Sequence, residues 1–202
     1  MSRTVRESIN IPNTLTITRM ALALIAFSML LDATLTAKVA AIALFAVAAI
    51  TDFLDGQLAR SRGAITTFGK ILDPIADKVL VLGMFGVLAY LDVFPFWVVV
   101  PILAREVLIT VVRLWCLRRG VAIAAAGSGK QKTTVQFVAI GIILAELLRT
   151  THGAQLPQLE IAFGSSLNIL MYMALGIAVW LTTTSGISFF RANWTTVKAL
   201  VW

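Results

Sequence analysis

The sequence has few of the residues that form soluble surfaces and most metal centres. Charged residues make up only 13% of its 202 residues, and hydrophobic residues make up 59%. Soluble domains usually carry roughly a quarter charged residues, so this composition excludes an ordinary soluble protein and indicates an integral membrane protein. The single cysteine, Cys116, excludes an internal disulfide and any multi-cysteine metal site. It lies in an apolar stretch, so we expect it to be buried by packing.

Apolar segments account for most of the chain, although only one long run, from Ile161 to Phe190, has no charge at all. A segment such as "VAAIALFAVAAI" (39–50) has no polar face, whereas the helices of a soluble bundle need one. We therefore predict an all-α membrane protein with a single domain over residues 1–202. Its six transmembrane helices are expected at about 14–32, 37–60, 72–91, 94–118, 133–150 and 166–185.

The basic residues predict the orientation of this chain in the membrane, because cytoplasmic loops are rich in Lys and Arg. With six spans both termini lie on one side, and Lys38 and Arg149 are the only basic residues on the other. The expected cytoplasmic set is Arg3, Arg6, Arg60, Arg62, Lys70, Arg118, Arg119, Lys130, Lys132, Arg191 and Lys198. Both termini should thus be cytoplasmic. Residues 1–12 are consistent with either a short interfacial amphipathic helix or a disordered tail.

Four aspartates interrupt this apolar pattern in "TDFLDGQLARSRGAITTFGKILDPIADK" (51–78): Asp52, Asp55, Asp73 and Asp77. Spacings of three and four place each pair on one helix face. The expected loop at about 61–71 is short, so the second and third helices should be antiparallel neighbours with both pairs at similar depth. Carboxylates gathered in this way repel one another unless cations lie between them. Oxygen ligands without His or Cys favour Mg²⁺ or Mn²⁺.

Residues beside the aspartates suit a phosphate-bearing ligand. Small residues leave room for a close approach to the helix backbone, and these are Gly56, Ala59 and Gly69. Arg60 offers a fork of donors for phosphate oxygens. Pro74 suits a first helical turn, so we expect Asp73 to cap the third helix. Two alternatives remain open: salt bridges with Lys78, Arg60 and Arg62 that join two helices, and a pathway for protons or cations.

The spacing Asp52-x2-Asp55-Gly56-x2-Ala59-Arg60-x8-Gly69-x3-Asp73-x3-Asp77 resembles the signature of the CDP-alcohol phosphotransferase family at every defined position. Three further segments resemble the bacterial phosphatidylglycerophosphate synthases of that family: "NIPNTLTITR" (10–19), "AREVLITVVR" (104–113) and "GSGKQKTTVQ" (127–136). The likeness extends to about residue 150, and the last fifty residues look generic.

The resemblance implies six transmembrane helices, a homodimer and an active site on the cytoplasmic side of the bacterial inner membrane. It implies that Asp52, Asp55 and Asp73 bind two Mg²⁺ or Mn²⁺ ions, and that Asp77 binds metal or acts as the base. Positions that resemble contacts to the CDP-lipid are Asn13, Thr14, Asp52, Gly56, Ala59, Arg60, Thr66 and Gly69. The implied reaction transfers a phosphatidyl group from CDP-diacylglycerol to an alcohol and releases CMP. No nucleic acid partner is expected.

Basic residues on the same membrane side favour a phosphorylated acceptor, and sn-glycerol 3-phosphate fits. Arg105 and Arg113 are eight residues apart on one helix, so they share roughly one face, and arginine suits bidentate phosphate binding. Lys130 and Lys132 precede the fifth span. A salt bridge from Arg105 to Glu106 or Glu146 is the alternative for that arginine. For the two lysines the alternative is membrane topology alone.

Other functions remain open at this point. The same chemistry with inositol phosphate or phosphatidylglycerol as acceptor is the nearest. An aspartate-rich membrane prenyltransferase also binds a diphosphate through Mg²⁺, but it would need a larger helical bundle. A membrane cation transporter that uses the carboxylates is the alternative that is not an enzyme.

Overall fold

The computed structural model describes residues 11–62, 67–121 and 129–201, and it describes side chains within 17–51, 78–121 and 133–198. The described residues form helices and turns, without a strand. The chain divides into two compact units, Met1–Val87 and Leu88–Trp202. The expected N-terminal interfacial helix and Thr66 lie outside the described residues.

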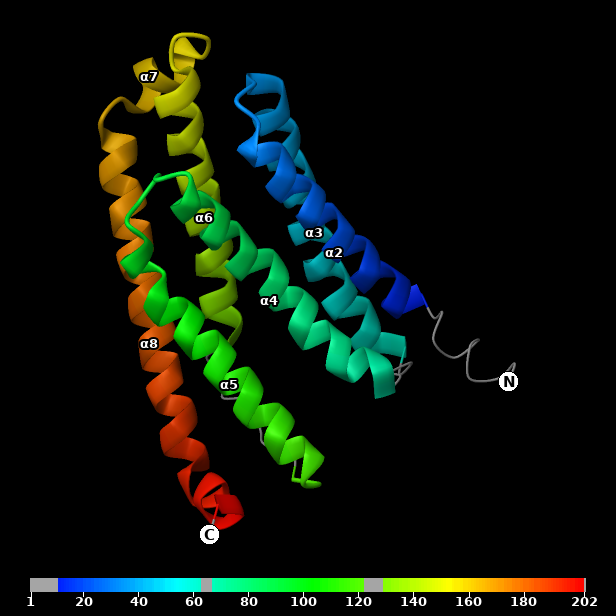
Figure 1. Ribbon diagram of the computed structural model, residues 1–202. Coiled ribbons are helices and arrows are strands. Elements are labelled where there is room, and N and C mark those ends of the chain that lie inside the picture. Colours follow the sequence, from blue (N-terminus) through cyan, green and yellow to red (C-terminus); the bar gives the residue numbers. More distant parts are fainter. Residues whose placement is uncertain (1–10, 63–66, 122–128, 202) are drawn as a thin grey trace. The chain divides into compact units, whose positions relative to one another are not determined.

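The first unit contains α2 (Ile11–Leu31), α3 (Leu35–Arg62) and most of α4 (Thr67–Tyr90), shown in blue to green in Figure 1. The helices α2 and α3 pack together along small side chains. Buried residues on the two facing helices are Ala23, Ala26, Leu30, Ala41, Phe45 and Ala48. Small residues allow helix backbones to approach closely, as is common in membranes.

Two local features hold the ends of these helices. Thr34 directly precedes α3 and caps it, because its hydroxyl accepts from the backbone N–H of Ala37 at 3.3 Å. Asp32 precedes it, outside both helices, and accepts from the backbone N–H of Thr34 at 2.8 Å.

The helix α4 contacts α2 at Gly83, where a Cβ would lie 2.5 Å from the ring of Phe27.

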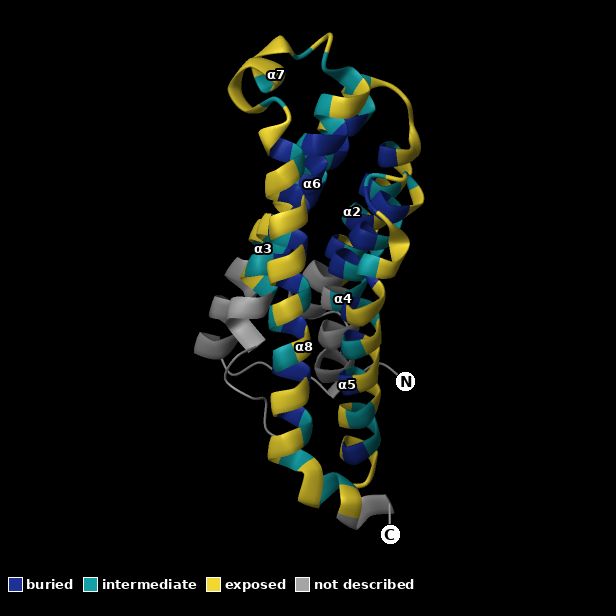
Figure 2. Cartoon of the chain, turned by 90° about the vertical axis from the view of Figure 1, so that its left-hand side faces the viewer, coloured by how far each residue is buried: buried dark blue, intermediate teal, exposed yellow. Residues whose placement is uncertain are grey.

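The second unit contains η1 (Phe96–Val98), α5 (Val100–Arg118), α6 (Gly129–His152), α7 (Pro157–Phe163) and α8 (Ser166–Val201). The long helix α8 packs against both α5 and α6. Its buried residues recur every three or four positions, as expected for one helix face: Leu167, Met171, Leu175, Ala178, Thr182, Ser185 and Phe189. Figure 2 shows buried and exposed residues alternating along α8. Cys116 in α5 is fully buried, which confirms its predicted packing role.

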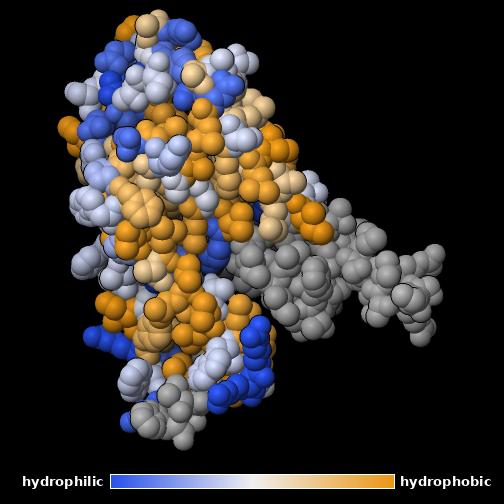
Figure 3. Space-filling model, viewed as in Figure 1, coloured by the Kyte–Doolittle hydropathy of each residue, from blue (hydrophilic) through white to orange (hydrophobic). Residues whose placement is uncertain are grey.

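The opposite face of α8 is exposed and also apolar, with Ile169, Met173, Ile177 and Trp180 one helical repeat apart. Figure 3 shows apolar side chains over α5 and α8, with hydrophilic ones near the C-terminus. A helix that is apolar all round is typical of a membrane span or a protein core. Since this face is exposed, a membrane environment explains it better than a core.

All six segments predicted as spans are helices, but their bounds differ. The helix predicted from 94 begins at Val100, because Pro95 and Pro101 lack the N–H that a helix interior needs; Pro101 occupies the first turn of α5. The short helix α7, between Pro157 and Gly164, was not predicted. Glycine suits its end, since Gly164 has φ of 48°.

The helix predicted to end at 185 continues to Val201. With 36 residues it is about 54 Å long at 1.5 Å per residue, longer than a hydrocarbon core of roughly 30 Å. Among the described residues, two helical segments are long and apolar enough to cross a membrane, Thr133–His152 and Ser166–Lys198. Within the residues whose side chains the structure describes, the other four predicted spans contain shorter apolar helices or more charge, and their crossing stays a prediction.

Candidate active site

The four aspartates lie on two continuous helices. Asp52 and Asp55 belong to α3, which runs without a break to Arg62, and Asp73 and Asp77 belong to α4, which begins at Thr67. The helical spacing assumed for each pair is therefore present in the backbone. The four side chains lie outside the described residues.

The predicted start of the third span is wrong. Asp73 does not cap α4, because the helix begins six residues earlier, at Thr67. Pro74 consequently lies beyond the first turn, where it removes one backbone hydrogen bond, to the carbonyl of Lys70. Transmembrane helices tolerate such prolines when other groups satisfy the released carbonyl. The connection expected at about 61–71 is also shorter, since only residues 63–66 lie between α3 and α4.

Among the described residues, the other predicted contacts to the CDP-lipid fall on α2, α3 and α4. The helix assignments place Asn13 and Thr14 in α2, Gly56, Ala59 and Arg60 in α3, and Gly69 in α4. Lys130 and Lys132, predicted for the acceptor, lie in the first turn of α6. The side chains of all these residues lie outside the described part of the chain.

A divalent metal fits the donor chemistry of the aspartate pairs. The set consists only of carboxylates, which are hard oxygen ligands of the kind that Mg²⁺ and Mn²⁺ prefer. Helical spacing keeps the two members of each pair on the same side of the helix. Among the side chains that the structure describes, no three His, Cys, Asp or Glu residues gather to form another metal site.

Arg105 is held between α5 and α8. Its Nη1 donates to Glu106 Oε1 at 2.9 Å, and its Nη2 donates to Ser185 Oγ at 2.8 Å. Glu106 is only 1% exposed. The salt bridge that was the alternative explanation for Arg105 is thus present with Glu106, while Glu146 instead pairs with Arg149. An ion pair leaves other N–H groups of the guanidinium available.

Arg113 also faces α8, which confirms that the two arginines share one side of α5. Its guanidinium carbon lies 5.2 Å from the centre of the Phe189 ring. A cation over an aromatic face is attracted by about 0.5–1 kcal/mol when exposed, as Arg113 is. The phenyl ring is buried, so it provides a fixed support for the Arg113 side chain.

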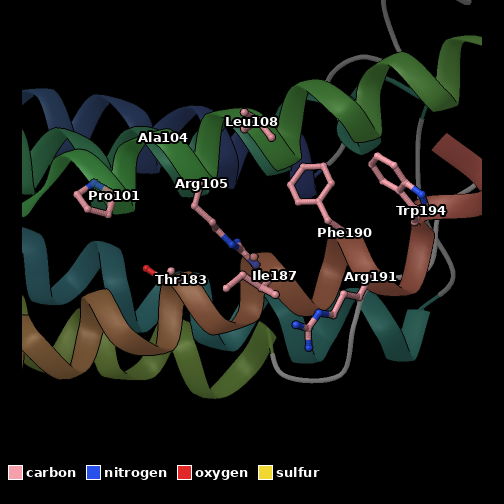
Figure 4. Close-up of a pocket in the computed structure, with 10 residues that line it drawn as sticks. Pro101, Ala104, Arg105, Leu108, Thr183, Ile187, Phe190, Arg191 and Trp194 are labelled. Atoms are coloured by element: carbon pink, nitrogen blue, oxygen red, sulfur yellow. The ribbon is translucent and has the colours of Figure 1, made fainter. Parts of the chain in front are cut away.

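A groove of about 560 Å³ lies between α5 and α8. Its walls are largely apolar, with Leu108, Ile187 and Phe190, and Arg105 and Arg191 supply its charges. Figure 4 shows Arg105 reaching from α5 toward α8 in this groove.

The contribution of α8 was missed by sequence reasoning. Ser185, Gly186 and Phe189 all meet predicted arginines, yet the last fifty residues looked generic. The signal that would have indicated them is "TTTSG" (182–186), five small residues inside an otherwise bulky apolar helix. Small and hydroxyl-bearing residues commonly lie at helix interfaces in membranes.

Sequence comparison decides the family. The profile of the CDP-alcohol phosphatidyltransferase family matches residues 9–188. The chain belongs to this family. The match spans both structural units and includes α8 as far as Ser188, so it covers the aspartates, Arg105, Arg113, Ser185 and Gly186, and it ends one residue before Phe189.

Several similar proteins carry names that state the same activity. A protein named CDP-diacylglycerol–glycerol-3-phosphate 3-phosphatidyltransferase from Bacillus subtilis (strain 168) is 33% identical over 201 residues, which are 94% of this chain and 97% of that protein. A protein of the same name from Rickettsia felis is 34% identical and covers 91% of this chain and 94% of its own length. A probable phosphatidylglycerophosphate synthase from Mycobacterium tuberculosis (strain ATCC 25618 / H37Rv) is 50% identical over 118 residues, 58% of this chain and 56% of that protein.

Proposed function

We propose that this chain transfers the phosphatidyl group of CDP-diacylglycerol to sn-glycerol 3-phosphate, forming phosphatidylglycerophosphate and CMP. The observation that carries the proposal is similarity over nearly the whole length to the Bacillus subtilis and Rickettsia felis proteins that bear this activity in their names. The complete aspartate motif, on two continuous helices, supplies residues suited to the chemistry.

In this proposal Asp52, Asp55 and Asp73 hold two divalent cations, Mg²⁺ or Mn²⁺, with Asp77 as a further ligand or as the base. When bound, such ions act as Lewis acids and offset the charge of the diphosphate. The chain's own contribution is to hold the carboxylates at helical spacing, so that their geometry is set before the substrate arrives.

Asp77 acts as the base. It accepts the proton of the acceptor hydroxyl, and the hydroxyl oxygen forms a bond to the lipid-bearing phosphorus. The bond from that phosphorus to the oxygen of CMP breaks, and CMP leaves with the electron pair. Positioning and electrostatic stabilisation account for most of the rate in reactions of this class.

Two further sets of residues bind the substrates. The CDP-lipid set comprises Asn13, Thr14, Asp52, Gly56, Ala59, Arg60, Thr66 and Gly69. Arg105, Arg113, Lys130 and Lys132 bind the phosphate of the acceptor. The contacts of Arg105 with Ser185 and of Arg113 with Phe189 support the acceptor assignment, because they hold two cationic groups on one side of α5.

The membrane topology is part of the same proposal. We infer six transmembrane helices in the bacterial inner membrane, with both termini and the active site cytoplasmic. The apolar exposed face of α8 and the excess of basic residues in the expected cytoplasmic segments support it. The homodimer is supported by the family resemblance.

The deciding experiment measures CMP release by the detergent-purified chain with CDP-diacylglycerol and Mg²⁺. Glycerol 3-phosphate, inositol phosphate and phosphatidylglycerol are offered separately. We expect release with glycerol 3-phosphate alone and its loss in Asp77→Asn. Asp92→Asn is a matched control, because Asp92 lies in a turn with φ of 56°, a conformation that asparagine also adopts.

Each other result has a distinct meaning. Release with a different acceptor would retain the reaction and change the assigned substrate. An active Asp77→Asn variant would show that another group is the base. No release with any acceptor, from folded protein, would contradict the enzyme assignment. Cation flux in proteoliposomes without CDP-lipid would then favour the transporter.

A further inference from the structure

The side chain of Arg105 crosses α8 at Gly186, where an added Cβ would force a neighbouring atom to shift. A Cβ added to Gly186 would lie 2.9 Å from Cγ of Arg105, 3.8 Å from its Nε and 4.0 Å from its Cδ. Carbon atoms in favourable contact are about 3.5–4.0 Å apart. Any side chain at position 186 would therefore push the middle of Arg105, and not only its flexible end, away from α8.

Ser185, the neighbouring residue, holds the end of the same side chain. Its Oγ accepts from Nη2 of Arg105 at 2.8 Å across a sequence separation of 80 residues. Glu106 accepts from Nη1 on the other side. The guanidinium is thus held at two atoms by two different helices, while its aliphatic part rests on the glycine.

An ion pair with Glu106 alone would not require this arrangement. Glu106 is adjacent to Arg105 on α5, so the pair forms without help from α8. The Nε of Arg105 is buried and has no hydrogen-bond partner among the described residues. A buried polar atom without a partner costs free energy, which is unexpected if the arrangement serves stability alone. Contact with α8 therefore fixes the orientation of the Arg105 side chain, although it leaves one of the hydrogen-bond donors of that side chain unsatisfied.

We propose that Ser185 and Gly186 are positioning residues that orient Arg105 to bind the phosphate of the acceptor. The proposal rests on the proposed function, in which Arg105 contacts that phosphate. It gives the C-terminal helix a role in acceptor binding: Gly186 leaves the space through which the side chain passes, and Ser185 sets the rotation of the guanidinium plane. Arginine binds phosphate best when its planar fork is aligned in advance.

The test compares Gly186→Ala with Gly176→Ala in the full chain, purified in detergent with Mg²⁺. Both glycines lie in α8, but a Cβ at Gly176 would meet nothing within 4 Å. Both variants gain the higher helix propensity of alanine, so the pair isolates the contact with Arg105. KM and kcat are measured separately for glycerol 3-phosphate and for CDP-diacylglycerol.

We expect Gly186→Ala to raise KM for glycerol 3-phosphate about tenfold, the effect of weakening one hydrogen bond to a charged group. KM for CDP-diacylglycerol should stay unchanged, and Gly176→Ala should match the wild type in both. In an Arg105→Ala background, adding Gly186→Ala should change nothing further, because residues that act through one side chain are not additive.

Ser185→Ala provides a second test that introduces no clash. It should raise KM for glycerol 3-phosphate several-fold, whereas Ser188→Ala should not, since Ser188 is exposed and donates to the backbone carbonyl of Thr184 in its own helix. This pair also serves if Gly186→Ala does not fold.

The outcomes separate this proposal from the proposed function. Wild-type activity together with unchanged KM in both Gly186→Ala and Ser185→Ala would overturn the positioning role alone. Equal rises in both KM values, or additive effects with Arg105→Ala, would show a merely structural role and also overturn it. Absence of CMP release from the wild type would remove the proposed function and this inference together.

Discussion

Arg149 donates two parallel hydrogen bonds to Glu146, from Nε to Oε2 at 2.8 Å and from Nη2 to Oε1 at 2.9 Å. The carboxylate side chain is only 2% exposed. The remaining Nη1 donates to Glu160 of α7 at 3.1 Å, and Asn168 of α8 donates to Glu146 at 3.3 Å. One buried carboxylate and one arginine thus connect α6, α7 and α8 at the end of the second unit.

Removing Arg149 should therefore destabilise the protein. Arg149→Met leaves Glu146 buried without its cation, which costs about 3 kcal/mol, and the thermal unfolding midpoint in detergent should fall. Glu160→Gln is the control, because Glu160 is 56% exposed and exposed ion pairs contribute about 0–1 kcal/mol. Equal midpoints for the two variants would show that the connection is not important for stability.

A buried hydrogen bond joins α6 and α8, from Nε2 of Gln136 to Oγ1 of Thr182 at 3.2 Å. Thr182→Val conserves shape but leaves the buried amide without this acceptor, so we expect a loss of about 1–3 kcal/mol in unfolding free energy. The matched control is Thr183→Val, since Thr183 is exposed and bonds to its own helix backbone. Chemical denaturation of both variants measures the difference.

One arginine within α5 and one directly after its end lie over aromatic rings, and the proposed function assigns a role only to the first. Arg113 lies over Phe189, and Arg119 lies 4.8 Å from the ring centre of Trp115. We expect Arg113→Ala to raise KM for glycerol 3-phosphate about tenfold, as loss of a charged hydrogen bond would. Arg119→Ala should leave it unchanged. A similar rise in both would point to general attraction of the anionic acceptor by basic charge.

Removal of divalent metal should abolish the reaction. We expect EDTA to stop CMP release, and Mg²⁺ or Mn²⁺ to restore it, because the aspartate set offers only hard oxygen ligands. Helix content measured by circular dichroism should persist in EDTA. Full activity after exhaustive chelation would contradict a metal role for the four aspartates.

The turn between α2 and α3 should make a small contribution to acid sensitivity. The backbone N–H and the hydroxyl of Thr34 hold the pKa of Asp32 below its ordinary value. A lowered folded-state pKa favours the folded state above the unfolded pKa of about 4. This contribution disappears as the pH falls through the folded-state pKa. The thermal unfolding midpoint of Asp32→Asn should therefore depend less on acidic pH than that of the wild type. Asp92→Asn should retain the contribution of Asp32.

Helices were predictable because their signals are local. Apolar stretches located α2, α3, α4, α5, α6 and α8, and the same composition predicted that Cys116 is buried. The errors were also local: Pro101 marks a first helical turn, whereas Pro74 lies well inside a helix. A proline alone does not reveal whether neighbouring groups compensate for its missing hydrogen bond.

The sequence by itself determined the chemical class of this protein. The spacing of Asp52, Asp55, Asp73 and Asp77 needs only the helical repeat to form two carboxylate pairs, and that motif leads directly to the family. Tertiary structure alone decided what surrounds Arg105. Its contacts with Ser185 and Gly186 join residues about eighty positions apart, and they depend on how α5 packs against α8. The small residues of "TTTSG" (182–186) indicate a helix interface but not its partner, because the partner is decided only when two separately formed helices bury their faces together.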